Sequence, residues 1–239
     1  MQYSNVFRFK QFTIVQDNAA MKVGTDSDLL GALAHGGHSI LDIGTGTGVL
    51  SLMMAQRFPD ASVTAVEIDE NAIKDATVNF STSPFADRIS LIHSAFQDFS
   101  KTHPKASFDC IICNPPYFDK SLECDNTSRS RARHTSSLPF DDLINGAYDL
   151  LCDGGVFSVC IPPEVHSDFT SRCIISGFWP LCSYDVKSVP EKPTKRYILV
   201  FRKGKVEQAE KHTFCMRNAD RTVSDWYKEL MKDFLIGNL

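Results

Sequence analysis

Residues 42–48 read D-I-G-T-G-T-G, with an aspartate followed by a glycine at every second position. The apolar run before this segment predicts a buried strand, and the residues after it predict a helix. The glycines therefore lie in a strand-to-helix turn, where a ligand can approach bare main chain beside the unpaired N–H groups of the helix N-terminus. We interpret the turn as a cofactor-binding loop. Its candidate cofactor-binding residues are Asp42, Gly44, Thr45, Gly46 and Gly48.

The spacing of these glycines indicates which cofactor the loop binds. A dinucleotide-binding loop reads G-x-G-x-x-G and leaves room for a pyrophosphate at the helix N-terminus, whereas here the third glycine comes one residue earlier. Asp42 would repel a nearby diphosphate but could accept a hydrogen bond from a cationic or amine group. The pattern therefore favours S-adenosylmethionine over NAD. Glu67, with Ile68 beside it, ends the next predicted strand, where an acidic residue contacts ribose hydroxyls in nucleotide-binding units.

Asn114, Pro115, Pro116 and Tyr117 follow a strand predicted over residues 108–113. The two prolines fix φ and remove both N–H donors, so this turn is stiff and presents carbonyl oxygens without competing donors. Asn114 adds a side-chain oxygen, and Tyr117 adds a flat ring with a polar tip. Together these groups could accept both hydrogens of a planar exocyclic amino group and hold its nitrogen in line with a methyl donor. We assign the four residues as catalytic candidates, and Asn114 also as a cofactor contact.

The elements that position these residues alternate between strand and helix over residues 39–161. Such alternation predicts a doubly wound α/β sheet, mostly parallel, with helices on both faces. Ligands bind such sheets outside the carboxyl ends of the strands. Ala95 and Phe96 follow the strand expected at residues 89–93. They are therefore candidate contacts for the adenine ring of the cofactor.

The N-terminal segment, residues 1–37, is expected to cap this fold. Residues 7–15 alternate well enough to predict a strand or a hairpin arm with an aromatic face. Thr25 or Asp26 is the expected N-cap of the helix that follows. The loop before that helix can fold back over the amino-acid end of the cofactor, where Lys22 and Thr25 are candidate contacts.

Residues 118–138 break the pattern with Ser, Asp, Asn and Arg, and a loop of this length is usually functional. We interpret it as a mobile lid of a single domain, residues 1–239, with a solvated charged loop as the alternative. Residues 181–189 and 196–202 predict a final strand pair, around which a second basic zone gathers. This zone comprises Lys187, Lys192, Lys195, Arg196, Arg202, Lys203 and Lys205. The candidate substrate-binding residues are Arg129, Arg131, Arg133, His134, Lys195 and Arg196.

Composition narrows the class of protein. Hydrophobic residues make up 43% and charged residues 23%, which is ordinary for a globular domain and argues against a disordered or fibrous chain. No apolar run approaches the ~20 residues that a membrane span needs, and the N-terminus lacks the pattern of a secretion signal, so a cytoplasmic protein is expected. The formal charge of −4 argues against general coating of nucleic acid and leaves a local patch open.

Eight cysteines raise the question of a metal site. Cys110 and Cys113 form a C-x-x-C, but they lie in a predicted strand, where positions three apart face opposite ways. Without a second such pair or nearby histidines, reduced core cysteines and no metal are expected. His93, which ends another predicted strand, is expected to be structural rather than catalytic.

The glycine loop, Glu67 and the N-P-P-Y turn, in this order, resemble a class I S-adenosylmethionine-dependent methyltransferase that acts on amino groups. The flanks are similar to the bacterial tRNA1(Val) adenine N6-methyltransferase family. They comprise F-R-F-K-Q-F at 7–12, Q-D at 16–17, A-M-K-V-G-T-D at 20–26, V-E-I-D at 66–69, S-P-F-A-D-R-I at 83–89 and A-R-H at 132–134. The resemblance covers most of the chain up to about residue 140. It implies a seven-stranded sheet whose last strand is antiparallel, and methylation of the adenine beside the anticodon of that tRNA. Separately from the resemblance, a monomer is expected.

One position departs from the family. Many relatives carry an acidic residue after the third strand, where this chain has His93, Ser94 and Ala95. Main chain near Ala95 and Phe96, or the side chain of Asp98, must then contact the adenine of the cofactor.

Three other readings remain open. A protein glutamine N5-methyltransferase uses the same N-P-P-Y geometry on an amide nitrogen, although such enzymes usually carry a helical N-terminal domain and only about 37 residues precede the first central strand here. A non-catalytic RNA-binding module would keep the fold without the chemistry. An NAD oxidoreductase fits the glycine spacing least well.

Overall fold

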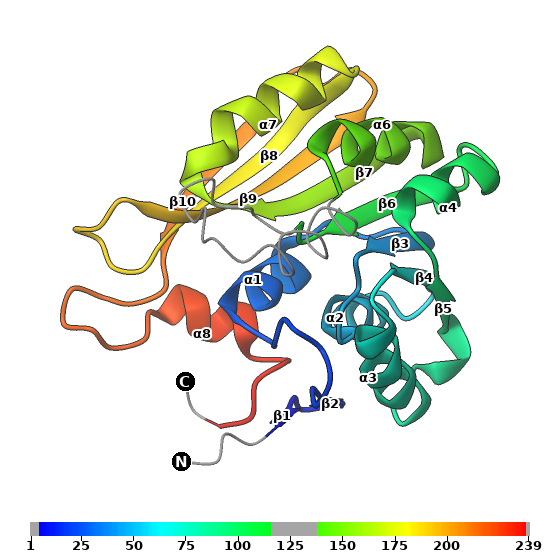
Figure 1. Ribbon diagram of the computed structural model, residues 1–239. Helices are drawn as coiled ribbons and strands as arrows, with labels where there is room; N and C mark the ends of the chain where they lie inside the picture. Colours follow the sequence, from blue (N-terminus) through cyan, green and yellow to red (C-terminus); the bar gives the residue numbers. More distant parts are fainter. Residues whose placement is uncertain (1–4, 116–137, 238–239) are drawn as a thin grey trace, which may run out of the picture.

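The computed structural model describes residues 5–115 and 138–237 of the 239-residue chain (Figure 1). Several predictions fall outside these residues. They concern Pro116, Tyr117, Arg129, Arg131, Arg133, His134 and nearly all of the loop 118–138.

An eight-stranded sheet forms the centre of the molecule, in the order β10-β8-β9-β7-β6-β3-β4-β5. Only β9 runs antiparallel to its neighbours in this sheet. The doubly wound fold with an antiparallel seventh strand is thereby confirmed, and β10 is an eighth strand that the sequence analysis missed. The strands are β3 (Ser39–Ile43), β4 (Ser62–Glu67), β5 (Ile89–His93), β6 (Phe108–Cys113), β7 (Leu151–Ile161), β8 (Phe178–Lys187), β9 (Thr194–Lys203) and β10 (Glu210–Cys215).

Helices cover both faces of the sheet (Figure 1). One face packs against α1, α2, α3 and α8, and the other packs against α4, α6 and α7. Parallel strands buried on both faces read as near-continuous apolar runs, as β6 does. The helices are α1 (Thr25–Leu33), α2 (Val49–Arg57), α3 (Glu70–Ser81), α4 (Phe96–Thr102), α6 (Phe140–Leu150), α7 (Pro163–Ile175) and α8 (Asp225–Met231), with a 3-10 turn at Ala86–Arg88.

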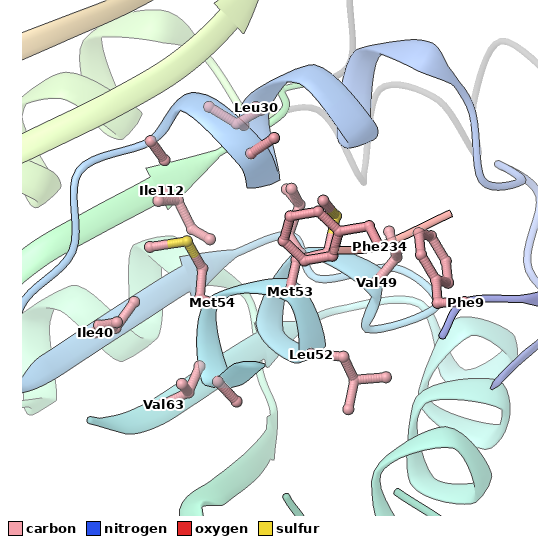
Figure 2. Packing of buried hydrophobic residues seen from close by; sticks show 14 of the residues in the cluster. Phe9, Leu30, Ile40, Val49, Leu52, Met53, Met54, Val63, Ile112 and Phe234 are labelled. Atoms are coloured by element: carbon pink, nitrogen blue, oxygen red, sulfur yellow. The ribbon is translucent and has the colours of Figure 1, made fainter. Parts of the chain in front are cut away.

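Two hydrophobic cores result, one on each face. Figure 2 shows the first, in which Leu30 of α1 and Met53 of α2 belong to the same cluster as the C-terminal Phe234. Cys110 belongs to this core and Cys113 belongs to the other, because residues three apart in a strand face opposite ways. The prediction that both are buried core thiols is confirmed, and burial raises the pKa of each thiol.

The N-terminal hairpin arm is confirmed as β1 (Val6–Arg8) paired antiparallel with β2 (Thr13–Val15). The N-cap prediction for α1 is wrong by one or two residues, since Gly24 occupies that position. Ser27 explains the shift, because its hydroxyl donates to the Gly24 carbonyl and accepts from the Gly24 N–H. In the part of the chain described, no helix combines the length and the apolarity that crossing a membrane requires.

Candidate active site

A cavity of about 720 Å3 opens at the carboxyl ends of β3, β4, β5 and β6, where a doubly wound sheet binds its ligands. Its volume suits a small-molecule cofactor. Nine of the predicted cofactor residues line it, namely Lys22, Gly44, Thr45, Gly46, Glu67, Ile68, Ala95, Phe96 and Asn114. Thr25, Asp42 and Gly48 do not.

The glycine loop presents bare main chain to this cavity. Gly44 and Gly46 have φ values of 70° and 58°, and no atom lies within 4 Å of where a Cβ would stand on either residue. A side chain at either position would strain the backbone and project into this space. The loop therefore leaves room for a ligand against its backbone.

Asp42 is buried beneath the glycine loop and stabilises it, and it does not line the cavity. Its Oδ2 accepts hydrogen bonds from the Thr45 hydroxyl at 2.6 Å and the Ser51 hydroxyl at 2.7 Å. Oδ1 has no partner among the described residues. Burial is the largest influence on this carboxyl and raises its pKa to about 6, with the negative charge of Glu67 adding to the effect. Asp42, predicted as a direct cofactor contact, therefore supports the loop and does not line the cavity.

Gly48 is also structural. It is the N-cap of α2 with φ of 85°, and an added Cβ would come within 2.3 Å of the Phe80 ring. Thr25 lies in the first turn of α1 outside the cavity, which Ser27 lines in its place.

Glu67 is held by main-chain donors at the cavity wall. Its Oε1 accepts from the N–H groups of Ile68 and Asp69, and its Oε2 accepts from the N–H of Gly46, each at 2.8 Å. A carboxylate can accept about four hydrogen bonds. It therefore keeps capacity for a hydroxyl donor from the cavity, which fits the ribose role predicted for it.

The segment after β5 forms another wall, to which Ser94, Ala95, Phe96 and Asp98 all contribute. Both predicted replacements for the missing acidic residue, main chain near Ala95 and the Asp98 side chain, are thus at the cavity. His93 does not line it and instead bonds through Nε2 to the Ile68 carbonyl at 3.0 Å. This contact supports a structural role for His93.

Asn114 stands next to the glycine loop because of strand pairing. Cys113 of β6 is paired with Ile43 of β3, so Asn114 and Gly44 follow neighbouring strands at the same edge. Asn114 is half-buried and lines the cavity, while Pro115 is buried. The turn predicted to hold an amino group therefore begins at the wall of the cofactor cavity.

The loop before α1 lies at the cavity, where residues 19–23 form one wall. Of these five residues, only Lys22 was predicted at the site. Asp75 of α3 holds this segment, since its carboxylate accepts from the N–H of Ala19 at 2.7 Å and from the main chain and side chain of Asn18. Lys22 in the same segment donates to the Asn5 side chain at 3.2 Å. A polar residue on a helix gives no sequence signal for contact with a loop more than 50 residues earlier.

The second basic zone is not one surface, contrary to the prediction. β9 runs antiparallel, so its first residues lie at the carboxyl edge of the sheet with the cavity, and its last residues lie at the opposite edge. Lys195 and Arg196 are at the cavity edge, whereas Arg202 and Lys203 are not. Lys203 is structural, because its amino group donates at 2.8 Å to the Tyr148 and Leu151 carbonyls that end α6.

One group of possible metal ligands occurs among the described residues, on β8 and β10 rather than at the C-x-x-C. Donor atoms of Cys182, Glu210 and His212 lie within 4.8 Å of one another, outside the cavity. Glu210 and His212 pair with each other at 3.2 Å.

Comparison with known proteins agrees with this geometry. Residues 19–162 match the family model of the methyltransferase small domain. Among solved structures, a predicted O-methyltransferase from Agrobacterium tumefaciens superposes with a TM-score of 0.69 at 21% identity, over 87% of this chain and 96% of that one. Pyrococcus horikoshii TYW2, in complex with MeSAdo, gives 0.59 at 18% identity, over 83% and 71%. These similarities establish the fold.

Curated relatives are similar over nearly the whole chain. A protein of Bacteroides thetaiotaomicron is 41% identical over 96% of this chain and 97% of its own length. Others from Flavobacterium psychrophilum and Yersinia pseudotuberculosis are 38% and 36% identical, over 97% of this chain and 99% and 92% of their own lengths. All three carry the name tRNA1(Val) (adenine(37)-N6)-methyltransferase. With the cofactor cavity and the Asn114 turn in place, this chain belongs to the class I S-adenosylmethionine-dependent methyltransferases, in the tRNA1(Val) (adenine(37)-N6)-methyltransferase family.

Proposed function

We propose that this protein transfers a methyl group from S-adenosylmethionine to the exocyclic N6 of an adenine in tRNA, namely adenine 37 of tRNA1(Val). The observation that carries the proposal is that Asn114 and the glycine loop share one cavity. The full-length relatives, all named for this reaction, support it.

The residues of the cavity fit S-adenosylmethionine, whose part in the reaction is to supply an electrophilic methyl group. Glu67 would accept from the ribose hydroxyls, and Gly44 and Gly46 give the ligand access to bare main chain. Ile68, Ala95 and Phe96 would surround the adenine of the cofactor. Lys22, Thr45 and Asn114 would face its amino-acid end.

The chain's own contribution to the reaction is to position the target nitrogen. The Asn114 side-chain oxygen and the Pro115 carbonyl would accept the two N6 hydrogens, with Pro116 and Tyr117 completing the turn and stacking the target base. With the nitrogen held there, N6 would form a bond to the methyl carbon that S-adenosylmethionine supplies as the methyl–sulfur bond breaks, and the proton that N6 loses would pass to water. Holding reacting atoms in a near-attack arrangement can contribute several kcal/mol to the rate.

The tRNA must deliver its base to this turn. Bases of an anticodon loop can be splayed out and stacked on aromatic side chains, and the target adenine must leave its stack to reach the cavity. We assign phosphate contacts to Arg129, Arg131, Arg133, His134, Lys195 and Arg196. We also propose that the protein acts as a monomer, and because tRNA is its substrate we place it in the cytoplasm.

Nucleoside mass spectrometry tests the proposal. Bulk tRNA from a strain lacking this gene is incubated with purified protein and S-adenosylmethionine, and N6-methyladenosine is expected to appear. Asn114→Ala should abolish methylation while the cofactor still binds in calorimetry. Asn145→Ala, on the exposed face of α6, is the matched control and should retain activity. Methyl transfer to protein instead of RNA would move the assignment to a glutamine N5-methyltransferase, and turnover by Asn114→Ala would refute the catalytic role.

A further inference from the structure

The eighth strand brings the C-terminal part of the chain to the edge of the sheet that carries the cavity. β10 pairs parallel with β8, so both strands end where β9 begins. The ladder continues past the strand ends, since Met216 N–H donates to the Lys187 carbonyl at 2.9 Å and Arg217 N–H donates to the Ser188 carbonyl at 3.0 Å. The loop after β10 therefore lies against the loop between β8 and β9.

These two loops, residues 188–193 and residues 216–224, are joined by side chains as well. Arg221 forms an ion pair with Glu191 at 2.9 Å across the gap between them. The second loop is also fixed internally, since the Arg217 guanidinium donates to the Arg221 carbonyl at 2.8 Å and Asn218 N–H donates to the Thr222 carbonyl at 2.9 Å. Figure 1 shows both loops, in gold and orange, projecting on the left of the view, on the side of the molecule where α8 lies.

The joined loops and the strand ends next to them are strongly basic. Residues 187–196 and 216–224 carry six cations and two carboxylates, in a chain whose formal charge is −4. Glu191 is engaged by Arg221, and Asp220 accepts from Thr222 within the turn. Neither Lys192 nor Lys195 forms an ion pair with any described residue, and both side chains are exposed. The cations are Lys187, Lys192, Lys195, Arg196, Arg217 and Arg221.

A short path connects this surface to the cavity. The Arg196 guanidinium donates to the Asp26 carboxylate at 2.8 Å, with both side chains about one quarter exposed. Ser27, the next residue, lines the cavity. A long polyanion bound on the basic surface could therefore extend to the cavity mouth.

We propose that residues 187–196 and 216–224 form a basic rim that binds the phosphate backbone of the tRNA, and that β10 serves to hold its second half in place. This inference rests on the proposed function. The rim combines three lysines with three arginines that Asp26, Glu191 and the Arg221 carbonyl hold in place. Such a set of cations suits phosphates, because contacts to them position an RNA without reading its sequence. Base selection is left to the cavity.

Binding of tRNA, measured by fluorescence anisotropy over a range of salt concentrations, tests the rim. Lys192→Gln combined with Lys195→Gln removes two cations of the first loop, and Arg217→Gln removes one of the second. Each lost phosphate contact lowers the slope of log affinity against log salt by about 0.7 to 0.9. The double variant should therefore bind roughly tenfold or more weakly at moderate salt, with a slope lower by about 1.4 to 1.8. Its affinity for S-adenosylmethionine should not change.

The matched control combines Arg202→Gln with Lys205→Gln, two exposed cations at the opposite edge of the sheet. It changes the net charge equally and should leave tRNA affinity nearly intact. If the two double variants lose affinity equally, or if Arg217→Gln has no effect, the rim is refuted even though the wild type methylates tRNA. If the rim variants bind tRNA more weakly than the wild type and the control, but the wild type forms no N6-methyladenosine, the rim is supported and the proposed function is refuted. If it fails to bind tRNA at low salt, both are refuted.

Discussion

Replacing Asp42 with asparagine should change how the stability of the fold depends on pH. Asp42 is fully buried behind the glycine loop, and two hydroxyls, those of Thr45 and Ser51, donate to one of its oxygens. An asparagine oxygen can accept the same two hydrogen bonds without carrying a charge. The substitution therefore removes an ionisation and keeps the contacts that brace the loop.

The pKa of Asp42 gives the sign and the size of the effect. Burial raises this pKa from 3.8 to about 6, so between these values the folded protein holds a proton that the unfolded chain has released. Stability supplied at this position is therefore lost as pH rises from about 4 to about 6. Between about pH 4.5 and pH 7.5 the loss is about 2 kcal/mol for a shift of this size. Asp42→Asn should not suffer it.

Urea unfolding of both proteins at these two pH values measures the difference. The difference in free energy of unfolding, Asp42→Asn minus wild type, should be about 2 kcal/mol more positive at about pH 7.5 than at about pH 4.5. Titrating groups that do not interact with Asp42 are common to both proteins and cancel in this comparison. Asp60→Asn, which alters an exposed carboxyl in a loop, is the control and should show a small difference at both pH values. A difference for Asp42→Asn that is constant with pH, or that grows in favour of the wild type, would refute the reasoning.

Three further substitutions test how the site is supported. Asp75→Asn replaces an acceptor of the Ala19 N–H, so it should cost about 1–3 kcal/mol of stability and weaken S-adenosylmethionine binding in calorimetry. Gly48→Ala puts a methyl group into the Phe80 ring at a positive φ and should cost about 1–3 kcal/mol in urea unfolding, which an unchanged midpoint would contradict. Lys203→Met removes two bonds to carbonyls at the end of α6 and should cost about 1–2 kcal/mol. The tRNA affinity of Lys203→Met should equal that of wild type. Weaker binding would indicate that Lys203 contacts RNA after all.

Local patterns predicted most of the elements. Strand 108–113 was predicted at its observed bounds, and the helix predicted after the glycine loop is α2, because an apolar run of strand length and a helical stretch after glycine are both local signals. β10 was missed because its sequence, E-K-H-T-F-C, is mostly polar and fits an exposed edge strand. Pairing with β8, almost 30 residues earlier, decides that it is a strand. The N-cap of α1 was misplaced because Ser27 reaches back to Gly24, and either threonine or aspartate looked a better cap by residue type.

The sequence by itself was sufficient to predict the type of reaction, which is methyl transfer from S-adenosylmethionine to an amino group. The D-x-G-x-G-x-G loop, Glu67 and the turn at Asn114 are defined by residue types at short spacing. The local backbone geometry of such short segments depends little on how distant parts of the chain pack. Tertiary structure decided which residues meet. It turned Asp42 away from the cavity, brought residues 19–23 to its wall through Asp75, and divided the basic residues of β9 between two edges of the sheet. Strand direction and long-range contact determine these outcomes, because they depend on how distant segments pack and leave no mark in local sequence.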